Sequence, residues 1–170
     1  SNEAIITLTF TAQPPVAVDD TVTGATPLTA VTVDPLGNDS DPDGSLDPVT
    51  VILTGTGAPA GSTLAPDGKT LTVPGEGVST VNTTTGAITF TPEPTFAGDP
   101  TPVAYTVADN DGNASNEAVV TIDYDQQPAL SLVTGIVGVD DTNGNAATDP
   151  GDIVTFSFTV TNTGNVPLTG

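Results

Sequence analysis

Apolar and polar residues alternate along most of the chain with a period of two, which is typical of β-strands half buried against a core. Between residues 118 and 124, for example, every second residue is apolar, and Thr121 and Asp123 lie between them. The same alternation predicts strands near residues 3–10, 49–54, 88–91, 103–107, 118–124, 130–139 and 153–162. Pro and Gly interrupt almost every window long enough for a helix. The pattern therefore predicts an all-β fold.

Turn-forming residues separate the predicted strands. Asp67-Gly68, Thr85-Gly86 and Asp111-Gly112 each lie between two alternating stretches, and these residue types favour tight turns. The 18 Gly and 16 Pro residues fall between the alternating runs. We expect short strands joined by many turns.

Charge and composition exclude several classes of function. The 170 residues include 21 acidic residues and one basic residue, Lys69, so the formal net charge is -20. Such a chain cannot neutralise phosphates and is repelled by anionic lipids, so neither nucleic acid nor membrane insertion is expected. The chain has no His and no Cys, which excludes the usual zinc ligands, thiol chemistry and a Ser-His-Asp triad. An acidic, thiol-free, Thr-rich composition favours an extracellular location.

One segment occurs twice in the chain. Residues 1–14 read SNEAIITLTFTAQP and residues 115–128 read SNEAVVTIDYDQQP, with the alternation in register. This repetition indicates that residues 1–14 contain the terminal strand of a preceding unit, or a donor strand. Residues 15–125 then form one complete unit. Residues 126–170 form a linker and part of a second β-unit.

Several longer motifs resemble a known family. They are PPVAVDD at residues 14–20, PLGNDSDPDG at 35–44, TGAITFTP at 85–92 and YTVADNDG at 105–112. Together they resemble the CshA-type fibril repeat of bacterial surface adhesins, which has affinities to cadherin-like and Ig-like repeats. Residues from about 130 resemble the start of a different bacterial surface repeat. The resemblance implies an Ig-like antiparallel β-sandwich, a tandem arrangement, a cell-surface location, a role as stalk, fibre or adhesive module, and no enzymatic activity.

Acidic residues between the strands are candidate Ca²⁺ ligands. Carboxylates that crowd one loop repel one another unless a cation neutralises them, and Ca²⁺ takes six to eight oxygen ligands in flexible loops. We expect three short acidic stretches to lie at the same pole of the sandwich. The alternative is a solvated acidic turn built from ordinary turn-forming residues. The candidate ligands are Asp19, Asp20, Asp39, Asp41, Asp43, Asp109 and Asp111.

Residues 141–152 have the spacing of an EF-hand-type Ca²⁺ loop. Oxygen-bearing side chains occupy loop positions 1, 3, 5, 9 and 12, which are positions of that loop. They are Asp141, Asn143, Asn145, Asp149 and Asp152. Two departures matter: Ala146 replaces the usual Gly at position 6, and position 12 is Asp rather than Glu. The alternative is an Asn-Gly-rich hairpin connection.

Three further patterns are weaker. Lys69 is a candidate for the Lys–Asn cross-link of some surface fibres, but a solvated Lys in the Asp67-Gly68 hairpin is the favoured explanation. Carboxylates are plentiful enough for a glycosidase pair, but without Trp the chain offers little surface for sugar stacking. The VPLTG sequence at residues 166–170 is similar to a sorting signal with the wrong first residue, and a turn is expected there.

The sequence therefore predicts a structural repeat of an extracellular bacterial fibre or adhesin stalk, stiffened by Ca²⁺ at acidic loops. The residues after 128 supply too few strands for an Ig-like sandwich, which needs about seven. An open sheet edge accepts another strand, so neighbouring copies could assemble head-to-tail by strand complementation. A covalent tandem array is the alternative. A ligand-binding adhesive module that recognises a host or matrix glycan or protein is the second candidate function.

Overall fold

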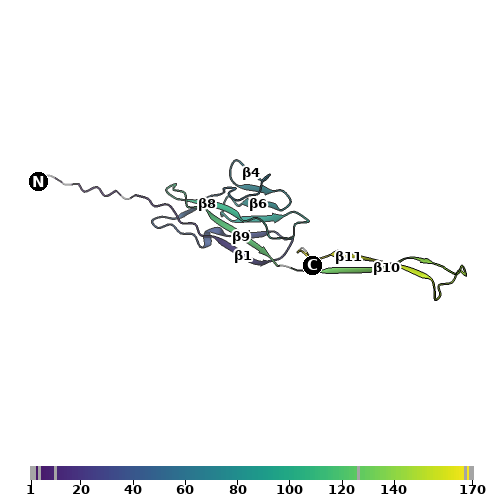
Figure 1. Ribbon diagram of the computed structural model, residues 1–170. Helices are drawn as coiled ribbons and strands as arrows, with labels where there is room; N and C mark the ends of the chain where they lie inside the picture. Colours follow the sequence, from purple (N-terminus) through teal and green to yellow (C-terminus); the bar gives the residue numbers. More distant parts are fainter. Residues whose placement is uncertain (1–2, 4, 10, 126, 167, 169–170) are drawn as a thin grey trace. The chain divides into compact units, whose positions relative to one another are not determined.

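The computed structural model describes residues 3, 5–9, 11–125, 127–166 and 168. They fall into two compact units, residues 1–125 and residues 126–170. Apart from one short 3-10 helix, η1 (Pro35–Gly37), the regular structure of these residues is β-strand, which confirms the all-β prediction (Figure 1). The strands are β1 (Asp20–Ala25), β2 (Val31–Val33), β3 (Leu46–Leu53), β4 (Thr63–Leu64), β5 (Thr70–Val73), β6 (Gly77–Val81), β7 (Ile88–Pro92), β8 (Val103–Asp109), β9 (Ala118–Tyr124), β10 (Leu130–Asp140) and β11 (Ile153–Asn162).

The strands of the first unit form a sandwich of two sheets. One sheet has the order β1-β9-β8-β3 and the other has the order β2-β7-β6-β5-β4. The predicted sandwich is confirmed, but one pair departs from antiparallel pairing: β1 and β9 run parallel, with Asp20 opposite Val120. The connection between these two strands passes through the whole unit, so it is long enough for the crossover that parallel pairing requires. As a result, β9 lies between the first strand, β1, and β8.

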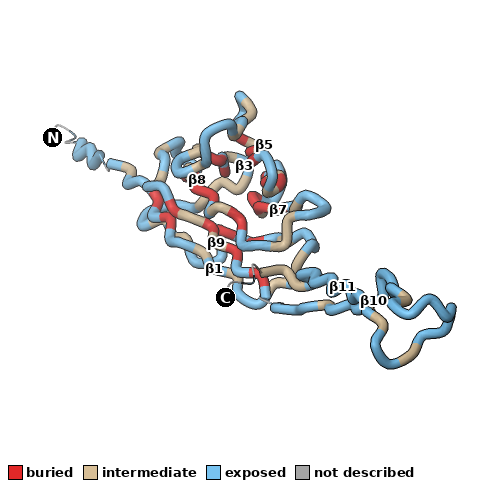
Figure 2. Tube along the Cα trace, turned by 45° about the vertical axis from the view of Figure 1, so that its right-hand side comes forward, coloured by how far each residue is buried: buried red, intermediate tan, exposed pale blue. Residues whose placement is uncertain are grey.

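The core of the first unit lies between the two sheets. In β9 the alternate residues 118, 120, 122 and 124 are at most 5% exposed, whereas Asp123 faces solvent (Figure 2). The second sheet contributes Ile88 and Phe90 of β7 to the same core. The period-two alternation of the sequence therefore separates the buried face from the solvent face, as predicted.

Strand β3 departs from regular pairing in its middle. Its register with β8 shifts between Asp47 and Ile52. Within this gap the Thr50 hydroxyl accepts the backbone N–H of Ala108 at 2.8 Å and donates to the carbonyl of Asp47 at 2.6 Å. The irregularity leaves Val49 52% exposed, whereas Val51 and Leu53 further along the strand are buried.

Lys69 completes the hydrogen bonding of the same gap. Its ammonium group donates to the carbonyl oxygens of Val49 at 2.7 Å and of Val51 at 2.5 Å. Backbone carbonyls that leave a ladder need other partners, and a charged donor is a strong one. The only basic side chain of the chain therefore supports β3.

The segment before the sandwich contains the first copy of the repeated sequence. Its predicted strand over residues 3–10 lies partly outside the described residues, and residues 3 and 5–9 do not belong to a strand. Ile5, Ile6 and Leu8 are exposed. Further along, the backbone N–H of Gln13 donates to Asp43 Oδ2 at 3.1 Å, which fixes the start of the unit to the loop that precedes β3.

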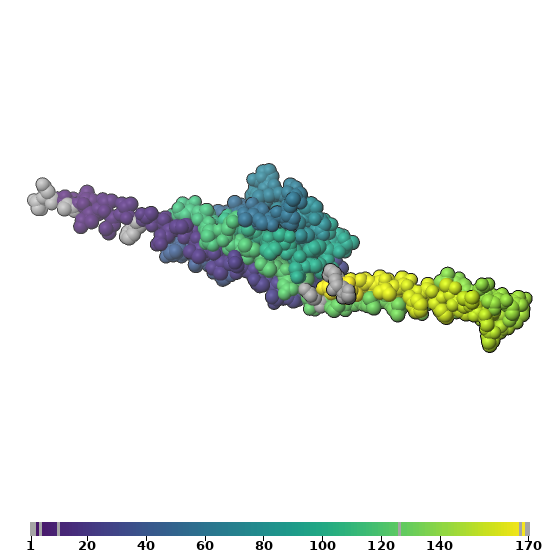
Figure 3. Space-filling model, viewed as in Figure 1, coloured from purple at the N-terminus to yellow at the C-terminus, as the bar shows by residue number. Residues whose placement is uncertain are grey.

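The second unit contains one long antiparallel hairpin, β10 with β11. Cross-strand pairs such as Leu132–Val160 and Ile136–Phe156 place apolar side chains on one face, while Ser131, Thr161 and other polar residues occupy the opposite face. The apolar face is exposed, and the hairpin forms a narrow ribbon in the space-filling view (Figure 3). A two-stranded hairpin alone is marginally stable in water. The end of the VPLTG sequence lies outside the described residues.

Candidate functional site in the acidic loops

Two of the predicted ligands, Asp20 and Asp39, meet at the buried side chain of Tyr105. The Tyr105 hydroxyl oxygen lies 3.1 Å from Asp39 Oδ2 and 3.2 Å from Asp20 Oδ2. The carbonyl oxygens of Val18 and Pro35 lie 3.3 and 3.2 Å from the same hydroxyl. A hydroxyl has a single proton to donate, so these acceptors share one donor. The arrangement concentrates negative charge around one buried group.

This crowding changes the acidity of both carboxyl groups. Burial raises the pKa of Asp20, and repulsion from Asp39 adds to the effect, although the hydrogen bond from Tyr105 opposes it. Burial also raises the pKa of Asp39, against the hydrogen bonds from the Val18 N–H and Tyr105. The pKa of the Tyr105 hydroxyl is itself raised by burial and by the two carboxylates. The folded chain therefore favours a proton on this group of side chains.

The carboxylates of Asp19 and Asp109 accept hydrogen bonds from backbone N–H groups of the first unit. Asp19 Oδ1 accepts the N–H of Val119 at 2.8 Å. Asp109 is 3% exposed and accepts the backbone N–H of Asp111 at 2.9 Å and that of Asn113 at 2.8 Å. Burial alone would raise the pKa of Asp109, but these bonds and the one from the Asn113 side chain lower it overall. Asp109 therefore holds the turn between β8 and β9.

Asp41 and Asn110 point oxygen atoms into one small space above Gly44. The Oδ2 atom of Asp41 is buried and has no hydrogen-bond partner among the described residues. A Cβ atom added to Gly44 would lie 2.6 Å from this oxygen and 2.4 Å from Asn110 Oδ1. Asn110 Oδ1 also accepts the N–H of Ser45 at 2.8 Å. An unpartnered buried carboxylate oxygen is costly, so this space is where a donor or a cation would be stabilising.

Asp43 and Asp111 line one open groove beside residues 11–13. Asp43 accepts the N–H of Gln13 with both carboxylate oxygens, at 3.2 and 3.1 Å. The structure therefore brings together Asp20 with Asp39, and Asp43 with Asp111.

The 141–152 loop folds around its own side chains. Asp141 accepts the backbone N–H of Gly144 at 2.6 Å and that of Ala146 at 2.7 Å, and the hydrogen bond from Ala146 is the main reason that the pKa of Asp141 is lowered. Asp152 accepts the N–H of Thr142 at 3.1 Å and that of Asp149 at 3.0 Å, which closes the loop. The side chains at positions 1 and 12 therefore organise the backbone between them.

The amide side chains of the same loop converge on Asp149. Asn143 Nδ2 donates to Asp149 Oδ1 at 2.9 Å, and Asn145 Nδ2 donates to Asp149 Oδ2 at 2.6 Å. Positions 3, 5 and 9 of the predicted Ca²⁺ loop thus meet in space. Their contacts are amide-to-carboxylate hydrogen bonds.

Ala146 adopts a backbone conformation that favours glycine. Its φ is 63°, and Leu28 is the other non-glycine residue with positive φ in the described part of the chain. The sixth position of an EF-hand loop carries an invariant Gly for a sharp turn. The chain makes a left-handed turn at this position despite the Ala, so the departure noted in the sequence has not changed the local backbone.

No group of three or more acidic side chains in the described residues lies close enough to hold a metal ion as the side chains stand. The nearest groupings combine one or two carboxylates with Asn oxygens or backbone groups. A cation in these loops would thus need amide and carbonyl ligands as well as Asp. Within the same described ranges, no helix is long and apolar enough to cross a membrane.

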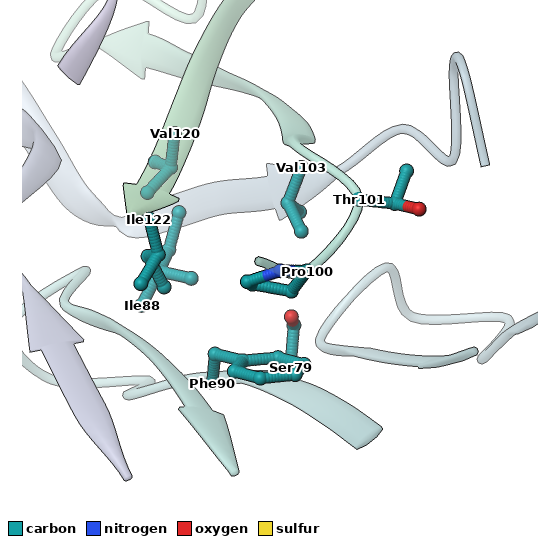
Figure 4. A pocket seen from close by; sticks show the side chains of 8 residues that line it. All are labelled: Ser79, Ile88, Phe90, Pro100, Thr101, Val103, Val120 and Ile122. Atoms are coloured by element: carbon teal, nitrogen blue, oxygen red, sulfur yellow. The ribbon is translucent and has the colours of Figure 1, made fainter. Parts of the chain in front are cut away.

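A small cavity lies between the two sheets of the first unit (Figure 4). Its volume is about 10 Å³, which is roughly the minimum for one water molecule. Its walls are mainly apolar, so it is a packing gap rather than a site for a sugar or a cofactor. The lining residues are Ser79, Ile88, Phe90, Pro100, Thr101, Val103, Val120 and Ile122.

Sequence reasoning did not single out three polar residues that the structure places at key points. The Tyr105 hydroxyl contacts the carboxylates of Asp20 and Asp39. Asn110 and Asp41 direct oxygen atoms to the same space beside Gly44. Asn116 forms hydrogen bonds with both backbone groups of Ala17. Tyr105 was predicted only as an apolar strand residue. Asn116 has an identical counterpart, Asn2, in the first copy of the repeated segment, and this identity is the sequence signal that could have identified Asn116.

A two-sheet sandwich with acidic turns, preceded by a segment that repeats the sequence of its last strand, has the organisation of a modular repeat. Residues 12–124 match the family described as the surface adhesin CshA repetitive domain. The chain belongs to this family, which confirms the resemblance seen in the sequence motifs. No curated protein and no solved structure matches the sequence. The family places the chain at the cell surface as a structural adhesin repeat, and such repeats are typically non-enzymatic.

Proposed function

We propose that the chain is a spacer repeat of an extracellular bacterial adhesin fibre, joined to neighbouring repeats by strand pairing and stiffened by Ca²⁺ at its acidic loops. The family supports the structural role, and the water-sized cavity gives no reason to assign a small-molecule substrate. The observation that carries the Ca²⁺ part is the left-handed Ala146 with its N–H on Asp141, in the loop whose spacing matches an EF-hand.

The donor set of the 141–152 loop suits a hard cation. Asp141, Asp149 and Asp152 carry carboxylates. The amide oxygens of Asn143 and Asn145 accept the backbone N–H groups of Asn145 and Ala147, and they become further ligands when a cation displaces those hydrogen bonds. Ca²⁺ binds oxygen ligands of these kinds. When bound, it would supply positive charge to a loop that otherwise satisfies its carboxylates with N–H donors.

The space above Gly44 is the second candidate. Asp41 Oδ2 lacks a hydrogen-bond partner among the described residues, and Asn110 Oδ1 converges on it. A cation there would satisfy the buried carboxylate oxygen and link the loop before β3 to the turn after β8. Binding to the folded state alone adds stability by mass action. Stiffening would follow because both loops would then be held at several points.

The test uses the full chain, first treated with a chelator and then titrated with Ca²⁺ or, in parallel, Mg²⁺. Amide signals in ¹⁵N–¹H spectra report the two sites separately: Gly144 and Gly151 for one loop, Gly44 and Ser45 for the other. We expect saturable shifts with Ca²⁺ and a higher Tm by calorimetry. Mg²⁺ should have a smaller effect, because it demands a tighter octahedral shell and keeps its waters.

Asp141→Asn is the matched variant for the first site. It should weaken the response of Gly144 while leaving the response of Gly44 unchanged. If neither set of signals moves at millimolar Ca²⁺ and the Tm is the same with chelator, Ca²⁺ has no part in the function. The structural role would then rest on the sandwich alone.

A further inference from the structure

The described residues of the 1–10 segment, 3 and 5–9, are not packed against the sandwich core in the way that the alternation of their sequence would allow. Among its described residues none lies in a strand, and Ile5, Ile6 and Leu8 are 88%, 85% and 76% exposed. Its second copy, residues 115–124, contains β9, which is buried between two other strands of the sandwich. The contacts of the second copy therefore show what the shared residues do.

Both copies begin with Ser-Asn-Glu-Ala, and in the second copy each of these four residues is hydrogen-bonded or buried. Ser115 Oγ accepts the N–H of Val107 at 3.1 Å, and Glu117 Oε1 accepts the hydroxyl of Thr56 at 2.6 Å. Ala118 is 2% exposed. Each of these residues contacts a different part of the repeat, namely β8, the loop after β3 and the core.

Asn116 makes the most specific of these contacts. Its Oδ1 accepts the N–H of Ala17 at 3.0 Å, and its Nδ2 donates to the carbonyl of Ala17 at 2.8 Å. An amide that binds both backbone groups of one residue fixes register and direction together. It ties the start of the last strand to the first segment of the same repeat. The identical residue in the first copy is Asn2.

The apolar positions of the two copies also correspond. Val120, Ile122 and Tyr124 fill the core from β9. The equivalent residues of the first copy are Ile6, Leu8 and Phe10, which have similar size and the same alternation. Exchanges of this kind between similar apolar residues are well tolerated in cores.

We propose that residues 1–10 are the closing strand of another repeat of the same kind, in which they fill the slot between its β1 and β8. This inference rests on the proposed function as a fibre repeat and names the partner surface. That slot pairs with both edges of the incoming strand, one parallel and one antiparallel, and receives its apolar face. The β10–β11 hairpin is a poorer acceptor, because the groups that receive Ser115, Asn116 and Glu117 belong to the sandwich.

The linkers that follow the two copies also resemble each other, which indicates that both copies are joined to the next unit in the same way. Seven of the fourteen positions are identical, including a Gln-Pro pair at the end of each copy. The N–H of Gln13 donates to Asp43, and the N–H of Gln127 donates to Asn165 Oδ1 at 2.6 Å. In each case the linker Gln is bound by a side chain of the unit that follows it. A closing strand followed by this linker is therefore a repeated structural element.

The direct test places the first copy in the slot of the full chain. Five substitutions, V119I, V120I, I122L, D123T and Y124F, convert residues 115–124 into the sequence of residues 1–10. We expect a cooperative unfolding transition with a Tm within roughly 10 °C of the wild type, because the exchanges nearly conserve volume. Part of that decrease would come from losing the Tyr124 hydroxyl bond to the Thr29 carbonyl, which is 2.8 Å long.

A control variant inverts the alternation without changing composition. V120T, T121V, I122D and D123I place polar residues in the core, so the cooperative transition should disappear. If the five-residue graft loses its transition in the same way, residues 1–10 do not fit the slot and the inference is overturned. The Ca²⁺ titrations use the wild-type chain, so they test the proposed function independently.

A second measurement uses the inverted variant as an acceptor with an open slot. A peptide of residues 1–14 should restore its unfolding transition, as should a peptide of residues 115–128. The same 1–14 peptide carrying I6D and L8D should have no effect. Rescue by the 115–128 peptide but not by the 1–14 peptide would overturn the inference.

Discussion

The hydroxyl of Tyr105 lies 3.1 Å from Asp39 Oδ2, and this contact joins the middle of β8 to the loop that precedes β3. Tyr105 is fully buried, and Asp20 approaches the same hydroxyl from β1. Three separate parts of the repeat thus meet at one polar group inside an otherwise apolar layer. Because two carboxyl groups share one donor, their protonation is coupled to folding.

The first prediction concerns the pH dependence of stability. The pKa values of Asp20 and Asp39 are higher in the folded chain than in the unfolded chain, so the folded state binds protons first as the pH falls. The contribution of this pair to stability therefore increases from neutral pH down through the raised pKa values, and levels off below the unfolded value of about 3.9. Asp109, Asp141 and Glu117 act in the opposite direction, because their pKa values are lowered.

Asp39→Asn isolates this effect. The amide keeps an oxygen for the Val18 N–H and can donate to Tyr105, while the negative charge is removed. We expect a Tm a few degrees above wild type at pH 7, and a gap that closes towards pH 4. The exposed Asp123→Asn is the control for loss of one negative charge. A gap that stays constant between pH 4 and 7 would contradict the prediction.

The second prediction concerns Lys69. Replacing it with Met removes the donor to the carbonyls of Val49 and Val51, so two backbone acceptors of β3 lose their partner. We expect destabilisation of about 1–3 kcal/mol, measured by urea unfolding. Thr83→Glu, in an exposed turn, gives the same net charge and should change stability by less than about 0.5 kcal/mol. Equal effects of the two variants would mean that Lys69 acts only through overall charge.

The third prediction concerns Gly77 in β6. A Cβ atom at this position would lie 2.3 Å from the carbonyl oxygen of Thr91 and 2.9 Å from the ring of Phe90. Gly77→Ala should therefore force apart β6 and β7 and destabilise the repeat by about 1–3 kcal/mol. Gly37→Ala is the matched control, because its Cβ would meet nothing within 4 Å. Thermal unfolding of both variants gives the comparison, and a stable Gly77→Ala chain would refute the close packing.

The fourth prediction concerns Ala146. Its left-handed backbone strains a residue with a Cβ atom, and Gly removes that strain. Ala146→Gly should favour the folded loop by about 0.5–1 kcal/mol, which corresponds to roughly two- to five-fold tighter Ca²⁺ binding. Titration followed at Gly144 measures it. Ala147→Gly, next in the chain and without positive φ, should weaken binding, and a similar response of both variants would argue against the strain.

Strong alternation in the sequence predicted the strands that form the centre of the fold. Residues 88–91, 103–107 and 118–124 are long enough and apolar enough to show a period of two, and they became β7, β8 and β9. Strands β1, β2 and β6 were not predicted, because each is short or carries polar residues in place of apolar ones. Ser79 in β6 is buried, for example, and only the tertiary packing shows this.

The acidic loops were located by their composition, but their internal contacts were not. The closely spaced Asp39, Asp41 and Asp43 identified the loop that precedes β3 as a candidate site. Only the fold shows that Asp39 turns inward to Tyr105 while Asp43 turns to the linker at Gln13. Long-range partners of this kind have no local signature in the sequence. The contacts of the 141–152 loop lie within twelve residues of one another, so sequence spacing alone grouped these side chains, although it did not predict their amide-to-carboxylate hydrogen bonds.

The parallel pairing of β1 and β9 has a mechanical consequence. Tension applied along the chain enters this repeat ahead of β1 and leaves it at the end of β9, so these two neighbouring parallel strands are pulled in opposite directions along their length. Their hydrogen bonds, from Asp20 opposite Val120 to Ala25 opposite Tyr124, are then loaded together in shear and cannot open one at a time. A repeat whose first and last strands pair in this way resists extension at the point where the load is applied.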